Sequence, residues 1–177
     1  MNFFKYFIKN EVDPSTIKYF LLAYGIKKRQ LRITERRTRN VNVSDIIGGS
    51  EKWAKTIKLY QDGIRAIEKG KAPRTTELYK HEYANAHQSH KHIAILRITN
   101  FLNLYNRIKS EGYRTTIKDM IRIMDIEGMP EPIEKFITTR FSDKYYRLTG
   151  MKRCIICDFL GIKTIQCRVL KIKVVQI

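Results

Sequence analysis

Apolar residues recur at helical intervals in two long segments of the chain, and each segment is followed by a glycine. In residues 50–69 the apolar positions are Trp53, Ile57, Tyr60, Ile64 and Ile67, and Gly70 follows. In residues 93–110 they are Ile95, Ile98, Phe101 or Leu102, Tyr105 and Ile108, and Gly112 follows. Both patterns predict amphipathic helices that end at the glycine. Residues 15–24 and 77–86 are predicted as shorter helices.

The second half of the chain alternates between strand-like and helix-like segments. Alternating apolar residues predict a strand at Ile121 and Ile123. Residues 132–141 are predicted as a short helix, and residues 145–148 as a strand that leads into Gly150. The apolar phase of residues 164–173 slips by one position at Val169, which predicts either a bulge or a strand buried on both faces. The order helix, strand, helix, strand, helix, strand predicts an α/β (α+β) fold with a small mixed or parallel sheet.

The length and the segment types suggest two regions. With 177 residues, the chain holds one ordinary domain, or a small core domain with an extension. A hydrophobic content of 43% is sufficient for a packed core. We predict a basic, mainly helical region over residues 1–92, with a short strand at 41–43, and a second region over residues 93–177 that contains the sheet.

The chain carries a formal net charge of +18, which disfavours compaction unless an acidic partner neutralises it. Nucleic acid is the expected partner, with an anionic membrane surface or a nucleotide-like substrate as alternatives. Arginine, whose planar fork suits phosphate, is concentrated in residues 27–39. The candidate nucleic-acid contacts are Lys27, Lys28, Arg29, Arg32, Arg36, Arg37 and Arg39. No helix-turn-helix or zinc-finger pattern is present, so we expect little base-specific contact.

Membrane and compartment signals are weak. No segment approaches the ~18 uninterrupted apolar residues of a membrane-spanning helix. The first twelve residues lack the features of a signal peptide. Their aromatic residues predict a helix that docks on the core, with an amphipathic helix on a membrane surface as the alternative. Three cysteines, an odd number, argue against a disulfide framework and for a reducing, cytoplasmic location.

Residues 149–153 place a glycine and two cations between a predicted strand and a predicted helix. Gly150 has no Cβ, so the backbone can bend tightly and approach a ligand. The first N–H groups of a helix have no intrahelical acceptor and attract anions, and Lys152 and Arg153 add positive charge there. This pattern predicts a phosphate site, with a plain strand-to-helix turn and solvated cations as the alternative. Its residues are Thr149, Gly150, Met151, Lys152 and Arg153.

The order of residues around this turn resembles the ParB/sulfiredoxin-like family. That family has a strand ending in a glycine, one variable residue, a basic pair, and a helix closed by Leu-Gly. Here the order is Leu148-Thr149-Gly150-Met151-Lys152-Arg153, then an apolar helix and Leu160-Gly161 before the last strand. The resemblance covers about the last 80 to 85 residues. It implies a nucleoside triphosphate ligand, CTP or ATP, with Mg²⁺ as an accompanying ion, and a phosphate contact from Arg153. The resemblance is also compatible with a homodimer.

One position departs from the family pattern. ParB proteins usually carry a glutamate after the glycine for metal binding and hydrolysis, and sulfiredoxins carry their reactive cysteine there, but this chain has Met151. The sulfiredoxin reaction is therefore excluded, and whether any bond is broken stays open. The alternative functions on this fold are an ATP- and Mg²⁺-dependent kinase of small molecules or nucleotides, a nucleotide hydrolase and a nuclease. A phosphotransferase needs an acid for Mg²⁺ and a base, for which Glu111 and Asp143 are the candidates.

The histidines and two of the cysteines are clustered along the sequence. His81, His87, His90 and His92 lie within one polar window. A metal site, a substrate or nucleic-acid contact, and a simple polar linker are the alternatives for this window. No established metal motif fits the spacing, so we assign no metal ligands. Cys154 and Cys157 form a C-x-x-C, but isoleucines separate them, which predicts inert thiols in a core helix.

Overall fold

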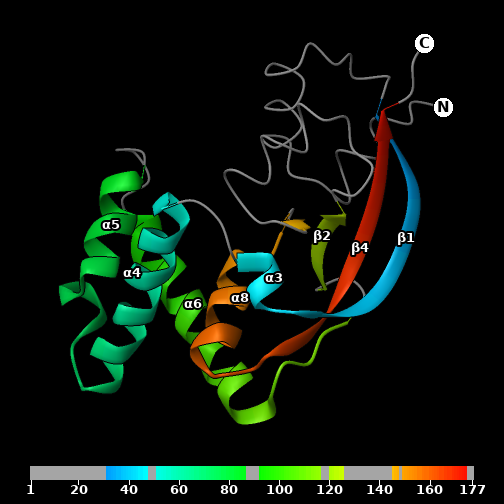
Figure 1. The fold of residues 1–177 in the computed structure, drawn as a ribbon. Coiled ribbons are helices and arrows are strands. Elements are labelled where there is room, and N and C mark those ends of the chain that lie inside the picture. Colours follow the sequence, from blue (N-terminus) through cyan, green and yellow to red (C-terminus); the bar gives the residue numbers. More distant parts are fainter. Residues whose placement is uncertain are drawn as a thin grey trace.

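The computed structural model describes residues 31–47, 51–86, 92–116, 120–125, 145–147 and 149–174. Within these residues, helices pack against a four-stranded sheet that contains both parallel and antiparallel pairs (Figure 1). The predicted α/β (α+β) fold with a small mixed sheet is therefore confirmed. The predicted helices at 15–24 and 132–141 lie outside the described residues.

The helices and strands follow the sequence patterns closely. The helices are α3 (Ser44–Ile47), α4 (Glu51–Glu68), α5 (Glu77–Asn85), α6 (His92–Glu111) and α8 (Met151–Phe159), and a 3-10 turn (Pro73–Thr75) precedes α5. The strands are β1 (Leu31–Asn42), β2 (Ile121–Asp125), β3 (Tyr145–Arg147) and β4 (Thr164–Val174). The predicted helices at 50–69, 77–86 and 93–110 are confirmed, as are the three C-terminal strands.

The sheet has the strand order β1-β4-β2-β3. Strand β4 runs antiparallel to β1 and parallel to β2, and β3 closes the other side antiparallel to β2. The long pair of β1 and β4 curves along one side of the molecule, opposite α4 and α5 (Figure 1). β1 thus belongs to the same sheet as the C-terminal strands, although it precedes residue 92.

Strand β1 is the main structural feature that the sequence pattern did not predict at its full length. Only residues 41–43 were expected as a strand, whereas β1 begins at Leu31. Residues 36–40 of β1 are exposed. Polar side chains project from both faces of this outer strand. Its sequence therefore lacks the alternation of apolar and polar residues that would predict a strand. The basic segment is therefore a sheet strand from residue 31 onward.

The phase slip in β4 has a clear structural cause. Val169 and Leu170 are both buried, and their register against Arg37 and Arg36 is continuous. Consecutive side chains in a strand point to opposite faces, so the sheet is covered on both faces at this point. The irregularity lies instead in β1, between Ile33 and Glu35. Burial on both faces, one of the two predicted alternatives, is confirmed.

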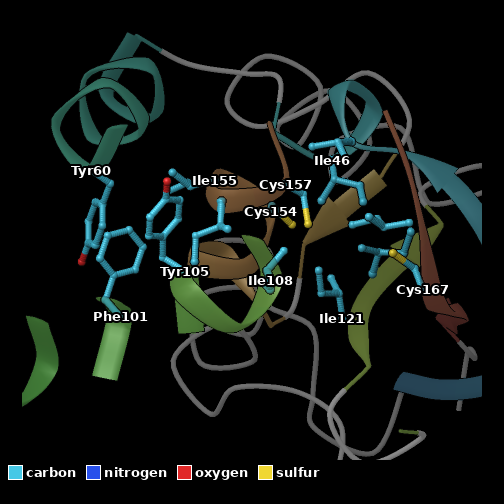
Figure 2. Close-up of a cluster of buried hydrophobic side chains, with 14 of the residues drawn as sticks. Ile46, Tyr60, Phe101, Tyr105, Ile108, Ile121, Cys154, Ile155, Cys157 and Cys167 are labelled. Carbon is cyan, nitrogen blue, oxygen red and sulfur yellow. The ribbon is translucent and has the colours of Figure 1, made fainter. Parts of the chain in front are cut away.

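A single hydrophobic cluster joins residues from both predicted regions (Figure 2). The rings of Tyr60 on α4 and Phe101 on α6 meet edge to face, with centroids 4.9 Å apart. Ile46 from α3 packs in the same cluster as Cys167 from β4. Described residues on both sides of the boundary predicted at residue 92 therefore contribute to this cluster.

The three cysteines lie in this core as free, buried thiols. Burial raises the pKa of Cys154, Cys157 and Cys167 to about 12 each. At neutral pH they are protonated and act as small apolar groups, which confirms the prediction made for the C-x-x-C pair.

None of the helices within the described residues combines the length and the apolar composition that crossing a bilayer requires.

Candidate functional site

The turn at Gly150 has the geometry that requires a glycine. Gly150 precedes α8 with φ +85° and ψ +23°, in the left-handed region. A Cβ atom placed there would lie 2.6 Å from Cγ1 of the buried Ile121. The carbonyl oxygen of Gly150 accepts the N–H of Cys154 at 3.1 Å, which is the first hydrogen bond of the helix. Conformation and space together make a side chain unfavourable at this position.

Thr149 connects this turn to β2. Its N–H donates to the carbonyl oxygen of Arg122 at 3.1 Å, and its Oγ1 accepts the N–H of Arg122 at 3.1 Å. The hydroxyl oxygen proposed as a ligand group thus already serves as an internal acceptor. The turn is consequently held against β2 on one side and begins α8 on the other.

Lys152 is directed away from the turn and into the packing of the helices. Its Nζ lies 3.9 Å from Oε1 of Glu82 on α5 and 5.5 Å from the centre of the Tyr60 ring. Glu82 also accepts hydrogen bonds from the Tyr60 hydroxyl and, at 3.4 Å, from Arg97. Burial lowers the pKa of Lys152, and the charge of Glu82 acts in the opposite direction. The two cations of the predicted pair therefore do not point to one place.

Arg153 and Arg147 are the cations near the first turn of α8. Burial raises the pKa of the Cys154 thiol, and the positive charges of Arg147 and Arg153 both act against that rise. Arg153 also acts on the phenol of Tyr113, whose pKa burial raises to about 12. The guanidinium of Arg147 lies 4.5 Å from the centre of the Trp53 ring. Sequence reasoning placed Trp53 only on the apolar side of a helix and missed Arg147, although Arg147 stands only three positions before Gly150.

The other residues predicted at this site have separate positions. Met151 packs against the hydrophobic cluster. Glu111 is the exposed last residue of α6, and Asp143 lies outside the described residues, so the described part does not assemble the acid pair of a phosphotransferase. His81 and His92 are exposed on α5 and α6, whereas residues 87 and 90 fall outside the described ranges. No group of three metal-ligating side chains occurs among the residues that the structure describes.

The second candidate site is the basic outer strand of the sheet. Arg36, Arg37 and Arg39 on β1 are exposed, and Arg37 forms an ion pair with Glu35. Arg36 projects to the sheet face opposite to that of Arg37 and Arg39 because side chains alternate along a strand. Arg32 lies in β1 with its side chain outside the described part, and the candidates at positions 27–29 lie outside the described residues altogether.

Further arginines extend this basic surface across the sheet. Thr38 on β1 is the register partner of Arg168 on β4, and Arg168 is the partner of Arg122 on β2. The three side chains therefore form a row on one face of the sheet. The Nε atom of Arg122 is buried and donates to no acceptor in the part of the chain that the structure describes. Arg122 and Arg168 are register neighbours, so positive charge continues across this face of the sheet.

Comparison with known proteins shows no family model, no curated protein and no solved structure that matches this chain. The resemblance to the ParB/sulfiredoxin-like family therefore stays a prediction.

Proposed function

We propose that this protein binds nucleic acid along β1, through electrostatic contacts with the phosphate backbone. The observation that carries the proposal is the exposure of Arg36, Arg37 and Arg39 together on the outer strand of the described sheet. An arginine fork can donate two hydrogen bonds to one phosphate group. Residues 36–40 of β1 are all exposed, so this stretch of the strand can follow a phosphate backbone over several nucleotides.

The total charge supports the same function. A formal charge of +18 on 177 residues produces a strong positive potential, which steers polyanions toward the protein. Arg168 and Arg122 continue the positive charge from β1 across the sheet. The three buried thiols support the further proposal that the protein works in a reducing compartment such as the cytoplasm.

The test is the salt dependence of binding to a mixed-sequence DNA duplex. Each phosphate contact contributes about 0.9 to the slope of log affinity against log salt concentration. We expect the R36Q/R37Q/R39Q variant to bind more weakly and to lose about 2 to 3 from that slope. The control K58Q/K69Q/K71Q removes the same charge from exposed positions on and after α4. Equal losses in the two variants would indicate nonspecific charge attraction and would contradict binding along β1.

We further propose that a nucleotide phosphate binds at the Gly150 turn. This part of the proposal is supported by the left-handed glycine at the start of α8 and by the two arginines, Arg147 and Arg153, whose charges reach the first turn of that helix. Lys152 is left out of the contact set, because Glu82 and the aromatic rings of α4 and α6 surround its ammonium group.

A thermal-shift panel of CTP, ATP and GTP, with and without Mg²⁺, tests the nucleotide site. A ligand that binds only the folded state raises its stability by about 2.7 kcal/mol at a hundredfold excess over Kd. We expect such a shift in the parent protein and its loss in Arg153→Ala. The Arg65→Ala variant is the control, because Arg65 is an exposed arginine on α4. Unchanged nucleotide affinity in Arg153→Ala would place the phosphate elsewhere.

A further inference from the structure

Strands β1 and β4 form a long antiparallel ribbon (Figure 1). Part of one face of this ribbon is polar. Residues directly opposed in a ladder project to the same face. Three consecutive pairs on this face are polar, and five of their six side chains are exposed, with Arg168 half-buried. The pairs are Thr38 with Arg168, Asn40 with Gln166, and Asn42 with Thr164. We call these six residues the polar ribbon face.

The two faces of the ribbon differ over these three pairs, whereas Leu170 in the next pair is buried on the polar side. On the other face, Val41, Ile165 and Cys167 are buried in the hydrophobic cluster. The ribbon is therefore held rigidly from behind, and its polar side chains are presented outward. Within the described residues, neither the Asn40 nor the Gln166 side chain makes a hydrogen bond. The centre of the polar ribbon face thus offers two adjacent amides with open donors and acceptors.

We propose that the polar ribbon face reads base edges in the major groove of duplex DNA. The inference rests on the proposed nucleic-acid function and adds the kind of nucleic acid and the mode of recognition. The major groove of B-DNA is about 12 Å wide and admits a two-stranded ribbon. Five residues of each strand span about 17 Å, and the strands lie about 4.8 Å apart. Strand β2 pairs with β4 only from Cys167 onward, so the end of the ribbon with residues 40–42 and 164–166 is two-stranded and fits the groove.

The side chains of the polar ribbon face match the hydrogen-bonding pattern of bases. Asparagine and glutamine can bond adenine through two atoms, and arginine can bond guanine in the same way. Asn40 and Gln166 form the central pair, and Arg168 stands in the next pair along the ribbon. Arg36, two positions before Thr38, lies on the same face and is exposed, so it can contact a phosphate that flanks the groove, whereas Arg39 projects to the opposite face. The face carries no acidic side chain, so nothing on it repels the phosphates.

The same face is less suited to other nucleic acids. The major groove of A-form RNA is deep and narrow, so side chains on a ribbon cannot reach its bases. Single strands are usually held by aromatic side chains on which bases stack, and the polar ribbon face has none. Duplex DNA is therefore the partner that this surface fits.

The experiment is selection from a library of DNA duplexes with a random central sequence. We expect the parent protein to enrich a preferred sequence, and the N40A/Q166A variant to lose about 5- to 100-fold of its discrimination at one or two base pairs. We expect its affinity for a mixed-sequence duplex to remain close to that of the parent, because the phosphate contacts are intact. The matched control is N103A/N106A, which removes two exposed amides from α6.

The possible outcomes separate this inference from the function on which it rests. Binding without enrichment of any sequence overturns major-groove reading and leaves backbone binding standing. Enrichment that N40A/Q166A does not alter, or a preference for single strands or RNA duplexes in a competition assay, also overturns it. Absence of binding to every nucleic acid tested overturns the proposed function itself.

Discussion

The ammonium group of Lys152 on α8 lies 3.9 Å from a carboxylate oxygen of Glu82 on α5, above the rings of Tyr60 and Phe101. Four helices therefore meet around one buried carboxylate, because Tyr60 belongs to α4 and Phe101 to α6. Glu82 is among the few buried polar residues in the described part, and its hydrogen bonds and ion pairs offset the cost of its desolvation.

Replacing Glu82 by alanine should destabilise the fold strongly. The change leaves the half-buried Lys152 and the hydroxyl of Tyr60 without this partner, so we expect a loss of about 2 to 4 kcal/mol in the free energy of unfolding. Glu77→Ala on the same helix is the control. Glu77 is exposed and pairs with Lys80, so its removal should cost much less than the removal of Glu82. Urea denaturation measures both, and similar values for the two variants would contradict a structural role of Glu82.

Gly150→Ala should destabilise the protein more than Gly161→Ala does. Both glycines have positive φ, +85° and +70°, so alanine is strained by about 1 to 2 kcal/mol at either position. Only at Gly150 does the new methyl group also overlap Ile121, whereas nothing lies within 4 Å at Gly161. We expect a total of about 3 kcal/mol for Gly150→Ala in thermal or urea unfolding. Equal losses of stability in the two variants would show that the Ile121 side chain moves aside without an energetic cost.

Thr149→Val should destabilise the protein and Thr149→Ser should not. Valine keeps the shape of threonine but lacks the oxygen that accepts the Arg122 N–H at 3.1 Å. A half-buried N–H left without its acceptor costs about 1 to 3 kcal/mol. Serine keeps the oxygen, so its variant should lie within about 0.5 kcal/mol of the parent. Hydrogen exchange at the Arg122 amide gives a second, local measurement, and unchanged protection in Thr149→Val would argue against this bond.

Stability should fall on the alkaline side, above about pH 9. Burial raises the pKa of each of the three thiols from 9.0 to about 12. In that interval the folded state retains protons that the unfolded chain releases, so the free energy of unfolding falls as pH rises. Each thiol contributes up to ~1.4 kcal/mol per pH unit. Burial lowers the pKa of Lys152, so this residue acts in the opposite direction and contributes at most one proton.

Urea unfolding between pH 7.5 and 10 measures this dependence. We expect little contribution from the thiols below pH 8.5 and a clear decline above pH 9. In Cys157→Ala the free energy of unfolding should fall less steeply with pH, by an amount that corresponds to up to one proton. This change in slope is independent of the effect of the variant on stability at neutral pH. A decline identical to that of the parent would show that this thiol ionises equally in the folded and the unfolded chain.

The helical elements were predictable because each carries a local signal. In α4 and α6, an apolar stripe at helical spacing and a terminal glycine mark the element without reference to the rest of the chain. The bend at Gly150 was also visible, because a glycine between a strand pattern and a helix pattern is a local feature. The core position of the C-x-x-C pair followed from the isoleucines between the two thiols.

The contacts between distant residues were decided only by the tertiary structure. The basic residues of β1 show no apolar alternation, and their strand forms because β4 supplies the hydrogen-bonding partner more than a hundred positions later. Lys152 seemed to belong to the turn because it adjoins Arg153 in sequence, but Glu82 and two aromatic rings draw its side chain into the helices. A local pattern shows which side chains a segment offers, whereas desolvation and charge pairing across the fold determine which of them remain exposed to a ligand.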